Sequence, residues 1–534
     1  MLPHVSLAPP HLSSARHPHT SHTSHRFQPP DAFRAARRLA LRAIPFVLCA
    51  LWVVLLLPAA RADDDRWYML ELVGKRSGYL HTVEKTEGKL IRSTSDTLFT
   101  IRRGQTALEV SASTEFVETA DGHPVSMSST QKLAGQPVVE KTTFTPDHLD
   151  ISATQAGHTT KSVRPLPTGD WLTPAAAQRR LIADLAAGKT TITIRSIDPS
   201  GGSDPITTTH TVLERATTAE ALGKVVPAIK WKIAIDKYPN MDTIEFADLS
   251  GNTIRAETDI GGLKVVQIAA DKDLALAKAD PPELLASTLI TPSKPIPNAR
   301  KSSSAAYVVS VNDGSLPDLP SSAFQKFERL DDRRARLTIT AAVADPAAPA
   351  DEADKDLLAA STMLNHRDPE VARVYAQAVK QAHKAGQPTP PTPEELRAFV
   401  YRFVSQRDFS VGFATASEVA RTHTGDCTEN AVLLAALLRA SGVPSRVVSG
   451  LIYVEQGAGA KGIFGYHMWT QALVTRDGKP VWINLDATLP GARAFDAAHI
   501  LLGVSSLADN QTQNFLVSFA PLLNRLRIDV EKVE

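Results

Sequence analysis

The sequence predicts an α+β protein, in which a mostly antiparallel β region precedes a C-terminal region of helices and strands. Residues 66 to about 275 alternate apolar and polar positions between turn signals, and from about residue 357 the apolar spacing becomes helical. The chain has 534 residues, 43% hydrophobic and 22% charged, which is typical of a globular protein of several domains. Its formal net charge of +1 gives no bulk attraction for nucleic acid, so we expect no nucleic-acid partner.

The first 62 residues have the composition of a leader and an export signal. Residues 1–36 are rich in His, Pro and Ser and are expected to be disordered. An apolar run over 43–57 follows a pair of arginines and ends at Ala60-Arg61-Ala62, a cleavage pattern. The run is shorter than the ~20 residues of a membrane-spanning helix. We therefore predict cleavage after Ala62 and an exported protein, periplasmic or secreted. An uncleaved anchor over 43–57 is the alternative, and it is the only membrane contact expected.

Residues 63–280 are predicted to form a β-rich accessory domain, an antiparallel sheet or sandwich. "KWKIAID" (230–236) and residues 242–260 have the alternation of paired strands. One helix is expected to interrupt the strands, over about 174–187. Three isolated histidines are predicted to be surface or turn residues rather than ligands: His123, His158 and His210.

Residues 281–349 are predicted to be a linker and a small β segment. The stretch "TPSKPIPNARKSSS" (291–304) is rich in Pro and Ser, which indicates a linker or an exposed loop. Two strand-like stretches, "AYVVSV" and "RARLTITAAV", follow within 305–343.

Residues 350–534 are predicted to form the second large domain. A helical pattern over 369–386 ends at Gly386. Thr392 and Glu395 then have capping-box spacing for a helix that runs to about Val404. Alternating apolar residues in "RLRIDVEKV", close to the C-terminus, predict a further strand.

The stretch "TGDCTEN" (424–430) contains Cys427, and the chain has one other cysteine, Cys49, inside the predicted signal. After cleavage Cys427 would be a lone thiol in an exported protein, which invites a functional explanation. Asp426 and Glu429 have capping-box spacing for an apolar helix that Gly442 ends. Cys427 is therefore expected on the first helical turn, where backbone N–H groups and the helix dipole stabilise a thiolate and could help to hold an oxyanion.

A predicted hairpin downstream supplies a base and a group to orient it. A strand over 445–454 and a Gly-rich loop, "EQGAGAKG", precede two strands joined by an Asp477-Gly478 turn. His467 and Asp486 face each other directly if paired residue numbers sum to 953, and are diagonal neighbours on one face if they sum to 955. Asn484 shares this face and is the second candidate for orienting His467.

Alone, His467 could be an ordinary strand histidine, Asp486 a strand-end cap and Cys427 a small buried residue. Together, in this order and on these predicted elements, they favour a Cys-His-Asp triad for acyl transfer.

Residues from about 417 to 490 resemble the bacterial transglutaminase-like superfamily. The matching blocks are "ASEVARTHTGDCTENAVLLAALLRASGVPSRVVSGL", "YHMWTQALV" and "VWINLDATLPG". The resemblance implies a papain-like, transglutaminase-core catalytic domain, in which the helix bearing Cys427 packs on an antiparallel sheet carrying His467 and Asp486. It also implies a thioester intermediate on protein or peptide substrates, with cell-envelope material among the candidates. It leaves open whether water or an amine is the second nucleophile.

Three expectations depend on this resemblance. Family members often supply an oxyanion side chain upstream of the nucleophile, and Gln406 is the candidate by position, with no role as the alternative. Trp469 could shield the site, with core packing as the alternative. No cofactor and no metal are expected, because one thiol and scattered histidines form no ligand cluster. A non-catalytic envelope binding or scaffold protein that keeps the fold is the competing hypothesis.

Overall fold

The computed structural model describes residues 64–534, except 104–105, 134–136, 156, 237–240, 261–262, 283–288, 342–343, 349–350, 352–353, 387–389, 407–413, 458–459, 492–494 and 509–521. The predicted leader and export signal, with the apolar run over 43–57, lie outside the described residues. Within the described ranges, no helix is both long and apolar enough to cross a membrane.

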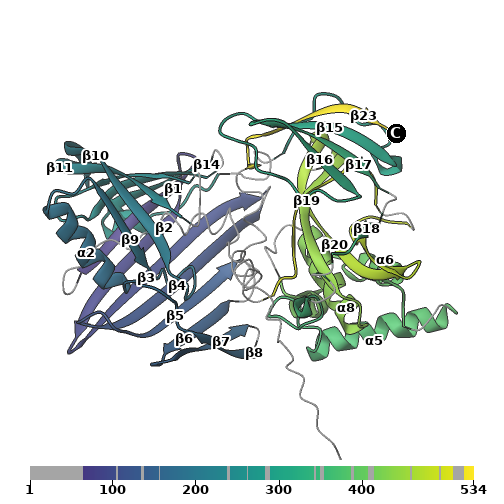
Figure 1. Cartoon of the computed structure of the whole chain (residues 1–534), viewed down its shortest axis with the longest axis horizontal. Helices are drawn as coiled ribbons and strands as arrows, with labels where there is room; N and C mark the ends of the chain where they lie inside the picture. The colour runs from purple at the N-terminus through teal and green to yellow at the C-terminus, as the bar shows by residue number, and fades with distance from the viewer. Residues whose placement is uncertain are drawn as a thin grey trace, which may run out of the picture. The chain divides into compact units, whose positions relative to one another are not determined.

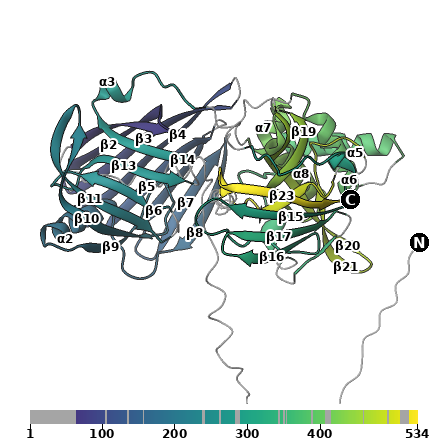
Figure 2. The same ribbon diagram turned by 90° about the horizontal axis from the view of Figure 1, so that it is seen from above.

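Fourteen antiparallel strands form one sheet in the β-rich region (Figures 1 and 2). Their order is β8-β7-β6-β5-β4-β3-β2-β1-β14-β13-β12-β11-β10-β9. The chain thus runs outward from β1 to β8, crosses through helix α2 (Pro174–Ala186) to the opposite edge, and returns from β9 to β14. The strands are β1 (Asp64–Leu72), β2 (Lys75–Glu87), β3 (Leu90–Arg103), β4 (Thr106–Thr119), β5 (Pro124–Leu133), β6 (Val138–Phe144), β7 (His148–Gln155), β8 (His158–Pro165), β9 (Thr191–Ser196), β10 (Ile206–Ala221), β11 (Lys224–Ile235), β12 (Thr243–Ala247), β13 (Thr253–Ile260) and β14 (Leu263–Ala270).

Local pattern predicts much of this sheet. The alternation in 242–260 becomes strands β12 and β13, which pair antiparallel around a turn where Gly251 adopts a φ of 80°. Helix α2 lies within a residue of its predicted range. The prediction for His210 is wrong, because this histidine is buried inside β10, in edge-to-face contact with Trp231.

The segment 291–304 is not simply an exposed loop. Ile296 and Ala299 are buried in a core that also contains Tyr307 and Phe464. The Ile296 amide donates a hydrogen bond to the Tyr453 hydroxyl at 2.9 Å. Its few apolar residues therefore anchor the Pro- and Ser-rich segment.

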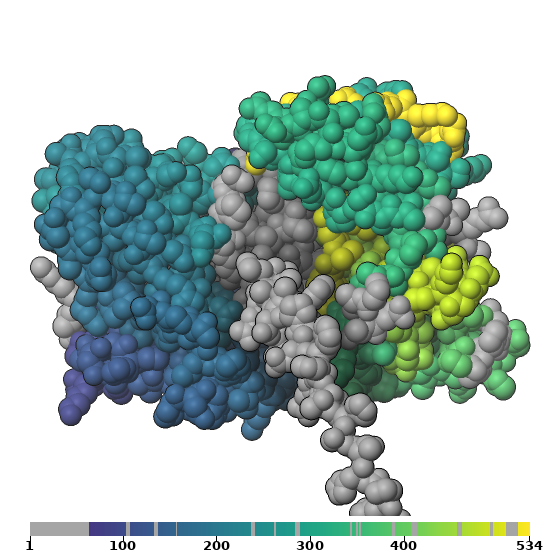
Figure 3. All heavy atoms as spheres, viewed as in Figure 1, coloured from purple at the N-terminus to yellow at the C-terminus, as the bar shows by residue number. Residues whose placement is uncertain are grey.

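A four-stranded antiparallel sheet combines segments that are far apart in the sequence, in the order β16-β17-β15-β23. β15 (Ser304–Val311), β16 (Gln325–Asp331) and β17 (Arg334–Thr340) lie within the predicted small β segment, and β23 (Leu526–Val533) is the predicted late strand. The space-filling view shows the yellow C-terminal residues beside this teal segment (Figure 3). Strands from both sides of the expected boundary at residue 350 thus share a sheet.

A five-stranded antiparallel sheet, in the order β18-β21-β20-β19-β22, carries the C-terminal helices. The strands are β18 (Asp345–Pro346), β19 (Ser445–Gly457), β20 (Ala460–Arg476), β21 (Lys479–Leu485) and β22 (His499–Ser505). The helices are α5 (Pro369–Lys384), α6 (Pro393–Phe403), α7 (Ala416–Thr422) and α8 (Cys427–Ala440), and shorter turns elsewhere are α3 (Lys272–Ala275), η3 (Ala299–Lys301) and η4 (Lys355–Leu357). The predicted Gly-rich loop is shorter than expected, because β19 and β20 extend through it to the pair Gly457 and Ala460.

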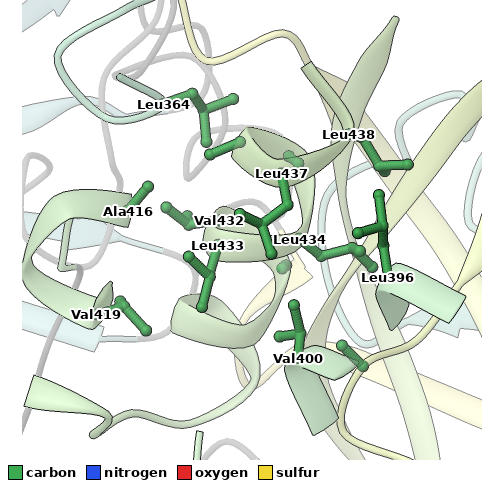
Figure 4. Close-up of a cluster of buried hydrophobic side chains, with 14 of the residues drawn as sticks. Leu364, Leu396, Val400, Ala416, Val419, Val432, Leu433, Leu434, Leu437 and Leu438 are labelled. Carbon is green, nitrogen blue, oxygen red and sulfur yellow. The ribbon is translucent and has the colours of Figure 1, made fainter. Parts of the chain in front are cut away.

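Helix α8 is the centre of the C-terminal core. Its Val432, Leu433, Leu434, Leu437 and Leu438 are fully buried, and side chains of α6, α7 and the segment before α5 surround them (Figure 4). A helix that is apolar on all sides needs such complete enclosure. The described chain is thus mostly antiparallel β, and its helices concentrate around α8.

Candidate active site

Cys427 is the first residue of α8, as the sequence predicts. Asp426 caps the helix by accepting the Thr428 amide at 2.9 Å, and Glu429 accepts the Asp426 amide at 2.9 Å. These contacts form the predicted capping box. Cys427 is partly buried against the α8 core, and within the described chain it forms no disulfide.

The capping box changes one expectation about the helix N-terminus. The carboxylate of Asp426 takes the amides of Thr428 and Glu429, so these two N–H groups already have an acceptor and are not open to an oxyanion. Burial raises the pKa of Glu429 well above its ordinary value, and the charge of Asp426 raises it further. Glu429 is thus protonated more readily than an exposed carboxylate, which limits the negative charge beside the thiol.

The β20–β21 hairpin follows the second of the two predicted registers. Gln471 pairs with Asn484 and Thr470 with Leu485, so paired numbers sum to 955. His467 and Asp486, just beyond the end of β21, are therefore diagonal neighbours. His467 Nε2 lies 2.8 Å from Asp486 Oδ2, and both side chains are buried. Because a carboxylate only accepts, Nε2 carries the proton and Nδ1 keeps a lone pair in the neutral ring.

Contacts between α8 and β20 bring the first turn of the helix to this hairpin. The Thr428 hydroxyl lies 3.3 Å from Met468 Sδ, and the Thr470 hydroxyl donates to the Ala431 carbonyl at 3.0 Å. In the sequence, Cys427 directly precedes Thr428 and His467 directly precedes Met468, the two residues that make this contact. Since Met468 and Thr470 face α8, alternation along the strand places His467 on the other side of β20, with its partner Asp486.

Asp486 is held as an anion in a fully buried position. Burial alone would raise its pKa, but the neighbouring His467 and the hydrogen bonds from two imidazoles lower the pKa far below the ordinary value. Its other oxygen, Oδ1, accepts the Thr488 amide at 2.8 Å and the Thr488 hydroxyl at 2.7 Å. Arg397 of α6 donates to the Asp486 carbonyl at 3.2 Å and so holds the backbone as well.

The other predicted site residues have different surroundings. Gln406 is exposed, but it lies beside the loop before Cys427, where its Oε1 accepts the Thr424 hydroxyl at 2.9 Å and its carbonyl accepts the Gly425 amide at 3.0 Å. Trp469 is fully buried and donates to Asn484 Oδ1 at 2.9 Å. Asn484 Oδ1 also accepts a hydrogen bond from Gln471. Of the two candidates for orienting His467, Asp486 is therefore the one that contacts its Nε2.

His499, the first residue of β22, was not predicted as a site residue. It is fully buried, and its Nε2 lies 3.3 Å from Asp486 Oδ2. Its neighbours "DAAHILLG" contain no spacing that marks a site, so only the tertiary structure reveals it. In the described chain, His467, Asp486 and His499 form a group whose ligand atoms lie within 4.8 Å of one another. Both imidazoles direct Nε2 at the Asp486 carboxylate, so the three groups are hydrogen-bond partners of one another, and the expectation of no metal stays a prediction.

The comparisons with known proteins identify the domain around this site. The family model described as "Transglutaminase-like superfamily" matches residues 378–487, from within α5 to just beyond Asp486. The chain therefore contains a transglutaminase-like domain, which confirms the predicted family resemblance. No curated protein sequence matches the chain.

Three solved structures show distant likeness. A β-barrel-like protein of a domain of unknown function from Brucella abortus is 14% identical, with a TM-score of 0.31, over 39% of this chain and 96% of that one. A putative cysteine protease from Cytophaga hutchinsonii is 14% identical, with a TM-score of 0.24, over 43% of this chain and 86% of that one. A putative protease from Parabacteroides distasonis is 12% identical, with a TM-score of 0.17, over 67% and 63%. At these values the likenesses say nothing about activity.

Proposed function

We propose that the protein is a cysteine-dependent acyltransferase or amide hydrolase that acts on protein or peptide substrates. The observation that carries this proposal is the buried hydrogen bond between His467 and Asp486, in a hairpin whose strand β20 contacts the first turn of α8, where Cys427 lies. The transglutaminase-like family match supports the same assignment, with a papain-like arrangement of a nucleophile helix against an antiparallel sheet.

In this mechanism the Cys427 thiolate attacks the carbonyl carbon of an amide. The C–N bond breaks, and the leaving amine takes a proton from the His467 imidazolium. The acyl group then stays on sulfur as a thioester. His467 removes a proton from water or from an amine as that nucleophile attacks the thioester, which releases the acid or a new amide and returns the thiol. Asp486 keeps His467 in the tautomer and orientation that these transfers need.

The oxyanion formed in each step needs hydrogen-bond donors. Because Asp426 occupies the amides of Thr428 and Glu429, those two cannot serve, and we propose that a side chain outside the helix contributes a donor. Gln406 is the candidate by its position, since its backbone is bonded to residues 423 and 425 and its side-chain oxygen accepts the Thr424 hydroxyl in the loop before Cys427. We assign Trp469 to packing behind His467, with ring centroids 6.2 Å apart.

We propose that the substrates belong to the cell envelope, because the leader pattern over 1–62 indicates export. The protein would then be periplasmic or secreted, or anchored by residues 43–57 if the signal is not cleaved. The boundaries 63–280, 281–349 and 350–534 remain our proposal for its accessory, connecting and catalytic parts.

Replacement of Cys427 tests the proposed chemistry. Cys427→Ala should abolish turnover of any amide substrate found in a peptide screen, since it removes the atom that carries the acyl group. A thioester with the wild-type protein should be detectable by mass after acid quench. Thr422→Ala, on the exposed end of α7, is a control for changes near the loop and should retain activity. Full activity of Cys427→Ala would refute the proposal.

A primary amine separates the two reactions that the proposal includes. Incorporation of the amine into the acyl donor indicates transfer, whereas release of free acid alone indicates hydrolysis. A protein that binds peptides without consuming them, and whose thiol reacts like an ordinary one, would instead be a binding or scaffold protein.

A further inference from the structure

A second buried histidine contacts Asp486, and its ring centroid lies 6.0 Å from that of His467. His499 Nε2 lies 3.3 Å from Asp486 Oδ2, the same oxygen that His467 contacts at 2.8 Å. At the other side of its ring, Nδ1 lies 3.1 Å from Asp496 Oδ1 and 3.2 Å from the Asp496 carbonyl oxygen. His499 thus bridges two aspartates.

The geometry determines the protonation of this ring. A carboxylate and a carbonyl accept hydrogen bonds and cannot donate them, and a neutral imidazole has only one N–H. Both contacts of His499 are satisfied only when both nitrogens carry protons. The two aspartates are held as acceptors by other donors as well, from Thr488 on Asp486 and from the Ala498 amide on Asp496 at 2.9 Å. His499 is therefore an imidazolium between two carboxylates.

The surroundings stabilise this buried charge. Arg300 forms an ion pair with Asp496 Oδ2 at 2.9 Å, so charges alternate along Asp486, His499, Asp496 and Arg300. Phe495 stacks on the His499 ring with centroids 4.2 Å apart, and Trp469 meets it edge to face at 5.4 Å. Burial would lower the pKa of His499, but its hydrogen bonds to Asp486 and Asp496 raise it.

We propose that His499 is a positioning residue for the His467–Asp486 pair, and that its imidazolium both fixes the Asp486 carboxylate and neutralises part of its charge. This inference rests on the proposed function. Asp486 alone would stabilise the His467 imidazolium strongly through the Nε2 proton. With His499 bonded to the same oxygen, Asp486 stabilises that imidazolium less, so His467 gives up its other proton, on Nδ1, more readily to a leaving amine. Among the described residues, the other charged or titratable groups near this cluster are Arg300, Arg397 and Tyr307. Arg397 donates to the Asp486 carbonyl at 3.2 Å, and the Tyr307 hydroxyl donates to the Ala497 carbonyl at 3.0 Å.

The test is the pH dependence of Cys427 alkylation in the mature chain. A thiolate paired with an imidazolium reacts at low pH, and its reactivity changes in a second step where His467 loses its proton. His499→Gln keeps a neutral donor but removes the charge, so the second step should move upward by about one pH unit. Asp496→Asn weakens the hold on the imidazolium and should move the step in the same direction by less.

The outcomes separate this inference from the proposed function. If His467→Ala abolishes the second step and His499→Gln shifts it, both stand. An unshifted step in folded His499→Gln overturns the positioning role and leaves the proposed function intact. A wild-type profile identical to that of His467→Ala overturns both. His210→Gln, which removes a buried histidine of β10, is the matched control and should leave the step in place. An equal shift in this control would also overturn the inference.

A measurement on the wild-type protein covers the case in which the variants do not fold. Nitrogen NMR of histidine-labelled protein should show one imidazole that keeps both ring protons above the ordinary histidine pKa of 6.5, with contacts to the Phe495 ring that assign it to His499. A neutral His499 at pH 6 would contradict the proposed imidazolium.

Discussion

Two buried carboxylates of this protein have opposite protonation behaviour. Asp486 has two imidazoles at Oδ2 and two donors from Thr488 at Oδ1, so its charged form is stabilised and its pKa lies below the ordinary value. Burial raises the pKa of Glu245, on β12, to about 7, although the hydrogen bond from the Thr253 hydroxyl at 2.6 Å opposes the shift. The difference comes from the partners and not from burial, because both carboxylates are fully buried.

Glu245 should make the stability of the protein depend on pH. Its folded pKa of about 7 is above its unfolded value of 4.5, so the folded state binds the extra proton between these values. The free energy of unfolding should therefore fall as pH rises through this range. Glu245→Gln can keep the bond from Thr253. At pH 8 its free energy of unfolding should exceed that of the wild type by on the order of 2 kcal/mol, and at pH 5 the difference should be smaller. A difference that is equal at the two pH values, measured by urea unfolding, would contradict this.

At the scale of elements, α8 combines two features that its sequence encodes separately. Its apolar residues on all sides require burial at the centre of the domain, and its capping box fixes where it begins. Together they place Cys427 at a defined end of a helix that cannot shift along its axis without exposing leucines or losing its cap.

Substitutions of Asp426 should separate capping from charge. Asp426→Ala removes the cap and should cost about 1 kcal/mol of stability, whereas Asp426→Asn keeps a good capping group. Because Asp426→Asn removes a negative charge next to Cys427, the thiol should become more acidic, as seen in its alkylation profile. Thr392→Ala removes the equivalent cap of α6 and is the matched control. Thr392→Ala should lower the stability about as much as Asp426→Ala does and leave the alkylation profile of Cys427 unchanged. If Thr392→Ala changed that profile as much as Asp426→Asn does, the local charge effect would be refuted.

At the scale of the whole molecule, segments remote in sequence assemble the region around the site. β23 pairs with β15, more than 200 residues earlier, and β18 pairs with β21. Arg300 from η3 reaches Asp496, which precedes β22. The segments before residue 350 therefore help to build the surroundings of His499, in addition to any role in recognition by the β-rich region.

Export should remove the first 62 residues. When the full chain is produced in a bacterium with a general secretion system, the mature protein should begin at Asp63, because small residues precede that position in the Ala-x-Ala pattern. Intact-mass measurement of the periplasmic fraction checks this. Ala60→Leu should slow cleavage and serves as the comparison. A full-length protein that stays in the membrane fraction would favour the anchor over 43–57, and one that stays in the cytosol would contradict export.

The sequence by itself determined the features that depend on local periodicity. These are the β12–β13 pair, the α6 and α8 caps, the position of Cys427 at a helix start and the shared face of His467 and Asp486. Each follows from spacing within a few residues, where backbone geometry alone decides which side chains share a face.

Only the tertiary structure decided the rest. Local pattern left two registers open for the β20–β21 hairpin, and the structure has the 955 register. The burial of Ile296 depends on Tyr453, far along the chain, and the bond of His499 to Asp486 depends on how the sheet brings the end of β21 to the start of β22. The local spacing of Asp496 and His499 does not mark a site, because the role that we propose for His499 comes from its contact with Asp486, which only the folded sheet creates. Burial then makes each of those contacts strong, since little water is present to compete for the protons that they share.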